Sequence, residues 1–157
     1  MDRIFRIREV TLIFTGFFAE FFYEMLQSPF YRDTYTETFN ELLYRRAHCS
    51  VGDVLILLAF FWITSWIWRS RAWPEHGGWK PRAFFAASAF IYSMAAEFYY
   101  VEIARTWAYM DSMPRLPMTG LGLTVVMQWL VLPWIILSVS TRLVRGSRAM
   151  TLPGPRP

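Results

Sequence analysis

The segment Val51–Trp68, VGDVLILLAFFWITSWIW, decides the fold, because Asp53 is its only charged residue. Backbone N–H and C=O groups cannot be left unpaired in hydrocarbon, so a chain crosses a bilayer as a helix of about 20 mainly apolar residues. This run is long and apolar enough for that role. We therefore predict a transmembrane helix over 51–68.

Three further segments have the same character, over 10–27, 83–101 and 119–139. The first of them has the shortest uninterrupted apolar run, because Glu20 and Glu24 lie inside it. The chain has 157 residues, of which 55% are hydrophobic and 19% aromatic, a composition that is rare in a soluble domain. We predict a single all-α domain over 1–157, a polytopic transmembrane four-helix bundle whose first helix is retained in the membrane.

The basic residues divide unequally between the two sides of such a bundle. Most of the 16 Lys and Arg lie before the first span, between the second and third, or after the fourth: Arg3, Arg6, Arg8, Arg69, Arg71, Lys80, Arg82, Arg142, Arg145, Arg148 and Arg156. The other side has Arg32, Arg45, Arg46, Arg105 and Arg115. By the positive-inside rule both termini are expected in the cytoplasm. The basic residues thus indicate topology and contact with membrane lipids, and we expect no nucleic-acid partner.

Two segments outside the spans have features of their own. Apolar residues recur at helical spacing over 33–47, with charged residues on the opposite face, and Thr34 and Glu37 fit a capping box. We predict a short amphipathic helix there, lying in the outer interface, with a disordered polar loop as the alternative. The segment 151–157 is rich in Pro and Gly, and we expect a disordered tail.

Ionisable residues inside the spans are the strongest functional signal. A rise of about 1.5 Å per residue puts Glu20 near the midplane, Glu97 somewhat further out and Asp53 at the outer end of the second span. A charge at such depth costs several kcal/mol unless it is paired or hydrated. No basic residue lies in any span to neutralise these carboxyls. They are our candidate catalytic acid–base groups.

Other polar residues share helix faces with these acids or lie near their outer ends. We predict that Glu24, Gln128, Tyr109 and His48 bind a ligand beside the three candidate acids. The alternative is that the polar groups only hold the helices together. Such interhelical hydrogen bonds contribute about 0.6–2 kcal/mol each.

The sequence offers little to a cofactor or a metal ion. A haem needs an axial ligand at membrane depth, and neither His48 nor His76 lies in a predicted span. Cys49 is the only cysteine, and its spacing from His48 matches no closed zinc pattern. We therefore expect no cofactor and no metal.

Several short motifs together resemble a group of small four-helix bacterial membrane proteins of uncharacterised function. They are Glu20–Tyr23–Glu24, Ser28-Pro29-Phe30-Tyr31, Gly52-Asp53, Glu97, Trp107-Ala-Tyr109, Met113-Pro114, Pro117, Gly120-Leu-Gly122-Leu and Gln128. A proline of that group a few residues before the glutamine is replaced here by Val125 or a neighbour. The resemblance implies a location in the bacterial inner (cytoplasmic) membrane and implies no activity.

The layout is also distantly similar to the EXPERA family of sterol isomerases and sterol-binding proteins. Four helices, a long first outer segment and carboxyls on different helices carry this likeness. In that family, acidic residues in an aromatic cavity handle a lipid ligand. No motif of this chain matches that family residue by residue, so no role is transferred.

These observations lead to one functional hypothesis and two rivals. The hypothesis is a protein that binds a lipid or isoprenoid-like molecule in an outer-leaflet cavity, with proton transfer or isomerisation as the possible chemistry. The first rival is an accessory or assembly subunit of a larger membrane complex, which would contact partner subunits through outward-facing aromatics such as Trp62 and Trp66. The second is a transporter, which would need to oligomerise because four helices leave little lumen.

Overall fold

The computed structural model describes the backbone of residues 2–151 and the side chains of residues 8–147. In this part of the chain the fold is entirely helical, as predicted, and the elements in chain order are α1 (Asp2–Gln27), the 3-10 helices η1 (Ser28–Phe30) and η2 (Arg32–Tyr35), α2 (Phe39–Ile67), α3 (Trp73–His76), α4 (Trp79–Phe98), the π-helical turn η3 (Tyr99–Ile103) and α5 (Leu123–Thr151). The predicted disordered tail lies outside the described residues, apart from Thr151, which ends α5.

Three helices of the described chain are long and apolar enough to cross a membrane. They are α2, α4 together with η3, and α5 over Leu123–Ser147. The predicted first span forms a helix, α1, but does not reach this standard, because Glu20 and Glu24 interrupt its apolar run. The result is a helical protein with the features of a membrane protein.

The outer segment differs from the prediction. Helix α2 begins at Phe39 and continues without a break to Ile67, so residues 39–47 of the predicted interfacial helix belong to the same helix as the span predicted over 51–68. The start of the predicted interfacial helix lies instead in the 3-10 helix η2 and the turn after it. The capping box is formed by Thr38 and Glu41 instead of the predicted pair of Thr34 and Glu37, and α2 contains no Pro that would break it. The Thr34 hydroxyl donates instead to the backbone carbonyl of Ser28, at 2.5 Å.

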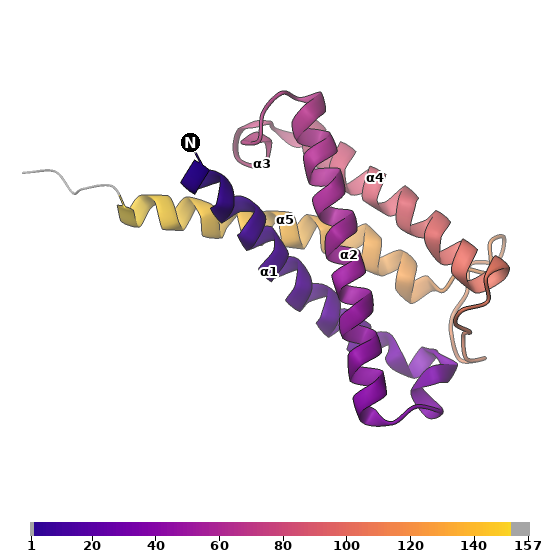
Figure 1. Cartoon of the computed structure of the whole chain (residues 1–157). Helices are drawn as coiled ribbons and strands as arrows, with labels where there is room; N and C mark the ends of the chain where they lie inside the picture. The colour runs from indigo at the N-terminus through magenta and orange to yellow at the C-terminus, as the bar shows by residue number, and fades with distance from the viewer. Residues whose placement is uncertain (1, 152–157) are drawn as a thin grey trace, which may run out of the picture.

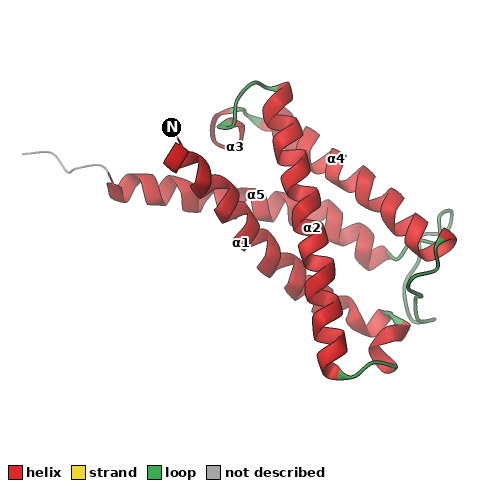
Figure 2. Cartoon of the chain, in the orientation of Figure 1, coloured by secondary structure: helices red, strands yellow, loops and turns green. Residues whose placement is uncertain are grey.

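Helix α1 lies between α2 and α5, and α4 packs against α5 and α2 (Figure 1). Gly16 permits the close approach of α1 to α2, because a Cβ atom there would lie 3.3 Å from Cγ2 of Val54. Large buried side chains such as Trp73 and Phe85 fill the core between the helices. The connecting loops gather at the two ends of the helices (Figure 2).

Two loop segments fold against each other at the end of the molecule where α1 ends and α2 begins. We call residues 28–38 and 104–122 the cap. Its halves are joined by a bridge between Tyr31 and Tyr109 and by backbone hydrogen bonds, including Met110 N to Phe30 O at 2.8 Å. The cap holds aromatic side chains over the ends of α1, α2 and α4.

Candidate functional site

Four carboxyl groups from three helices meet beneath the cap. Glu20 and Glu24 come from α1, Asp53 from α2 and Glu97 from α4, and we call these four residues the acidic cluster. Glu20 is 0% exposed, and Glu24 and Glu97 are each 8% exposed. Asp53 is half-buried, and it lies close enough to the other three for their charges to interact. The residues that were predicted to be acid–base groups therefore belong to one site.

Two glutamine amides connect the α1 side of the cluster to α5. Nε2 of Gln128 donates to Oε2 of Glu20 at 2.8 Å and lies 3.3 Å from Oε1 of Glu24. Nε2 of Gln27 donates to the same Glu24 oxygen at 2.8 Å and to Oε1 of Gln128 at 2.9 Å. This network fixes Glu20 and Glu24 on their rotamers and joins α1 to α5.

Arg46 is the buried cation of the site, with only 3% of its surface exposed. Its Nη1 lies 3.7 Å from Oε2 of Glu24, and its Nη2 donates to Oδ1 of Asp33 in the cap at 2.8 Å. The guanidinium also lies over the ring of Tyr31, at 4.9 Å from the ring centroid. Sequence analysis missed this residue by assigning it to a solvated interfacial helix. The available signal was its spacing of seven residues from Asp53, which puts both on one face of a continuous helix.

Glu97 is held by three neutral donors that converge on its Oε1 atom. The hydroxyl of Tyr109 donates a short hydrogen bond, Nε1 of Trp107 donates at 3.3 Å and the hydroxyl of Tyr31 donates at 3.4 Å. Burial, and then the neighbouring Glu97 carboxyl, raise the pKa of the Tyr109 phenol, so Tyr109 keeps the proton that it donates. The cap thus solvates Glu97 with side chains in place of water.

The carboxyls of Glu20 and Asp53 have far fewer hydrogen-bond donors around them than that of Glu97. Among the described residues, Glu20 receives a hydrogen bond only from Gln128, and no group donates one to Asp53. Oε1 of Glu20 and Oδ2 of Asp53 are both buried without a hydrogen-bond partner from the described chain.

The predicted ligand-binding residues divide into two sets. Glu24, Gln128 and Tyr109 belong to the site through the contacts above. His48 lies outside it, because its side chain is exposed and its ring stacks on Tyr44. Its position follows from α2 being continuous, since this residue then lies on the opposite face of the helix from Arg46 and Asp53. In the described residues no group of three or more His, Cys, Asp or Glu side chains has a geometry that would hold a metal ion.

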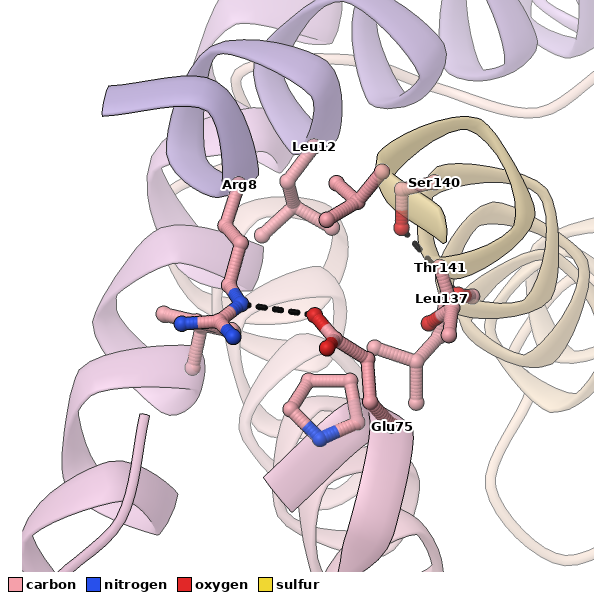
Figure 3. A pocket seen from close by; sticks show the side chains of 9 residues that line it. Arg8, Leu12, Glu75, Leu137, Ser140 and Thr141 are labelled. Atoms are coloured by element: carbon pink, nitrogen blue, oxygen red, sulfur yellow. Dashed lines mark hydrogen bonds and ion pairs between the residues drawn. The ribbon is translucent and has the colours of Figure 1, made fainter. Parts of the chain in front are cut away.

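A second buried polar site lies at the opposite end of the molecule, near α3. Nε of Arg8 and Oε1 of Glu75 form an ion pair at 2.7 Å (Figure 3). Arg145 donates a hydrogen bond to the backbone carbonyl of Glu75. The pair borders a cavity of about 10 Å³, which Ser140 and Thr141 also line. A cavity of this volume is about the size of one water molecule. The contacts tie α1, α3 and α5 together.

A larger hollow of about 330 Å³ lies between α1 and α5. Its lining is almost entirely apolar and contains none of the four carboxyls: Phe14, Thr15, Phe18, Ala19, Ile135, Ile136 and Val139. The hydroxyl of Thr15 donates to the backbone carbonyl of Thr11 at 2.8 Å, so it offers little to a polar ligand.

The comparisons with known proteins add no family to this picture. No family model, no curated protein and no solved structure matches this chain. The site therefore has to be interpreted from its own chemistry.

Proposed function

We propose that this chain is an integral protein of the bacterial cytoplasmic membrane that binds a lipid-like ligand at the acidic cluster and exchanges a proton with it. Three helices have the length and apolar character needed to cross the bilayer. The excess of Lys and Arg near the two termini and the α3 loop supports an orientation with that end in the cytoplasm. The cap and the acidic cluster then belong to the outer half of the membrane.

One observation carries the functional part of the proposal. Glu20 is fully buried and Asp53 half-buried, and each has a buried oxygen without a hydrogen-bond partner in the described chain, while the nearby cation, Arg46, is engaged by Glu24 and Asp33. Two uncompensated negative charges in a low-dielectric interior are strongly disfavoured, so such a pair binds a proton or a ligand. A carboxyl pair that shares a proton is suited to acid–base chemistry.

The chemistry we propose is proton transfer without net oxidation or reduction. The protonated carboxyl of the pair gives its proton to a ligand atom, and the ionised carboxyl accepts a proton from another atom of the same ligand. A double bond then shifts position. The pair still holds one proton, now on the other carboxyl, and this proton returns to the first carboxyl before the next turnover. Glu97 and Glu24, held by the cap and by Arg46, act as positioning groups.

The test is ligand retention after gentle extraction from the native membrane, followed by native mass spectrometry. The wild-type protein is expected to carry a stoichiometric apolar ligand, which the Glu20→Gln and Asp53→Asn variants lose while remaining folded. Glu102→Gln and Asp111→Asn are the matched controls, because both side chains are exposed and lie outside the cluster. Retention of the ligand by both cluster variants would contradict the proposal.

An accessory role in a larger membrane complex is the alternative, and the exposure of aromatic side chains favours it. Trp66 is 80% exposed and Trp79 is 72% exposed in this chain. The same extraction distinguishes the two functions. A stable complex with other polypeptides and no small ligand would support the accessory role, with the carboxyls then serving assembly.

A further inference from the structure

The unpartnered polar atoms around the acidic cluster define what kind of ligand head group it accepts. Oε1 of Glu20, Oε1 of Gln27 and Oδ2 of Asp53 are buried, and no described group donates a hydrogen bond to them. Ionised carboxylate and amide oxygens only accept hydrogen bonds, and the one proton that the Glu20–Asp53 pair holds leaves the other oxygens as acceptors. The site therefore presents unused acceptors from both α1 and α2.

A fourth unpartnered group comes from α4. Ser93 is 5% exposed, and its Oγ has no hydrogen-bond partner among the described residues. It lies four residues before Glu97, on the same helix face, so it is directed to the same side of α4 as the cluster. Buried serine hydroxyls usually find a partner, most often the backbone carbonyl of their own helix, as Ser50 does with Arg46 at 2.8 Å. Ser93 makes no such bond and is free to bond to a ligand.

The charges of the cluster add a second restriction. Four carboxyls face a single buried cation, Arg46, whose two terminal nitrogens are engaged by Glu24 and Asp33 and whose Nε is a buried donor without a partner among the described residues. One free N–H does not offset the negative charge of the surrounding carboxyls. A phosphate or carboxylate head group would meet like charge and acceptor oxygens that it cannot bond. Burial strengthens that repulsion, because screening by solvent is weak inside a protein.

We infer that the ligand of the acidic cluster carries a hydrogen-bond-donating head group without negative charge, a hydroxyl or an ammonium, on an apolar chain. The head group donates hydrogen bonds to the carboxyl oxygens of Glu20 and Asp53 and forms a further hydrogen bond with the hydroxyl of Ser93. This inference rests on the proposed function and specifies its substrate class. Phosphate-headed lipids are excluded from the site.

The test uses three tritiated amphiphiles of equal chain length: dodecanol, dodecylamine and dodecyl phosphate. Binding to the protein in nanodiscs is measured by scintillation proximity and corrected with empty nanodiscs. We expect dodecanol or dodecylamine to bind at least about tenfold more tightly than dodecyl phosphate, which corresponds to one charge-assisted hydrogen bond. If only the amine binds, the head group is an ammonium, and if the alcohol binds as well, a hydroxyl suffices.

Ser93→Ala keeps the test decisive even if the carboxyl variants fold poorly. The substitution removes a hydroxyl that bonds to nothing in the described chain, so it should leave thermal stability unchanged and weaken binding of the alcohol about fivefold. Ser140→Ala is the matched control, since Ser140 is also 5% exposed but donates to the carbonyl of Leu137 at the other end of the bundle.

Two results would overturn the inference. One is that dodecyl phosphate binds as tightly as dodecanol and dodecylamine or more tightly. The other is that neither dodecanol nor dodecylamine binds specifically. A phosphate-headed lipid that binds to the wild type and is lost in Glu20→Gln would still support the proposed acid–base site. It would contradict only the inferred head group.

Discussion

The two buried polar sites of this molecule treat charge in opposite ways. Near α3, the carboxylate of Glu75 pairs with Arg8 at 2.7 Å, and its side chain is 2% exposed. Beneath the cap, Arg46 lies within ion-pair distance of only one of the four carboxyls, Glu24, and one oxygen each of Glu20 and Asp53 has no partner from the described chain. In the first site the carboxylate of Glu75 is paired with its own cation, and the contacts hold helices together. The second is incomplete, and this difference is what identifies it as a place for a ligand or a proton.

The largest effect is expected from removing the cation of the acidic cluster. Arg46→Met removes the buried cation beside Glu24 and Asp33, and breaking a buried ion pair in this way typically costs about 3–5 kcal/mol of folding free energy. We expect a large fall in the thermal unfolding midpoint, measured in detergent with circular dichroism. Arg46→Lys should recover part of it. An unchanged midpoint in Arg46→Met would show that the cluster is not held by this charge.

A substitution in the ion pair near α3 should lower the stability of the protein less than Arg46→Met does. Glu75→Gln keeps a hydrogen-bond acceptor for Arg8 and keeps the backbone carbonyl that Arg145 uses. We expect a loss of about 1.5–3 kcal/mol, the usual value of a hydrogen bond to a charged group, with no change in ligand retention. Denaturant unfolding compared with ligand content by native mass spectrometry checks both parts. Loss of the ligand would mean that the two sites are coupled.

The three hydrogen-bond donors to Glu97 should contribute to stability in the order of their hydrogen-bond lengths, the shortest contributing most. Tyr109→Phe removes the short hydrogen bond and is expected to cost about 1–2 kcal/mol, whereas Tyr31→Phe removes a bond of 3.4 Å and should cost less. Hydrogen exchange of the cap backbone is the sensitive measurement, because both tyrosines join the cap to α4. Equal protection in the two variants and the wild type would contradict this role.

The smallest effect on stability is expected at Asp53. Because no described group donates a hydrogen bond to it, Asp53→Asn breaks no contact and removes repulsion from three carboxyls. The unfolding free energy should change by less than about 0.5 kcal/mol or should rise. Thermal unfolding of the variant beside Asp111→Asn measures this directly. A fall as large as that of Arg46→Met would mean that Asp53 has a structural partner.

Much of the architecture was predictable because apolar runs of bilayer length are a strong and local signal. The helices α1, α2, α4 and α5 were each expected within a few residues at one end. The extension of α2 to Phe39 was missed, because a polar helical segment beside an apolar one looks like two elements when only composition is considered.

Part of the candidate site was predictable from the free-energy cost of burying a carboxyl in an apolar helix. A carboxyl in an apolar run has to face partners, so Glu20 and Glu97 were placed together without any contact information. The donors of the cap were not predictable in this way. Trp107 and Tyr31 are close to Glu97 only because two loops far apart in the sequence pair through the bridge between Tyr31 and Tyr109.

The most direct test of the account is ligand retention by the Asp53→Asn variant after gentle extraction, measured by native mass spectrometry beside its thermal unfolding midpoint. The account predicts an unchanged or higher midpoint together with loss of the apolar ligand, because this carboxyl serves the ligand and not the fold. A lower midpoint with the ligand still bound would contradict it and would make Asp53 a structural residue.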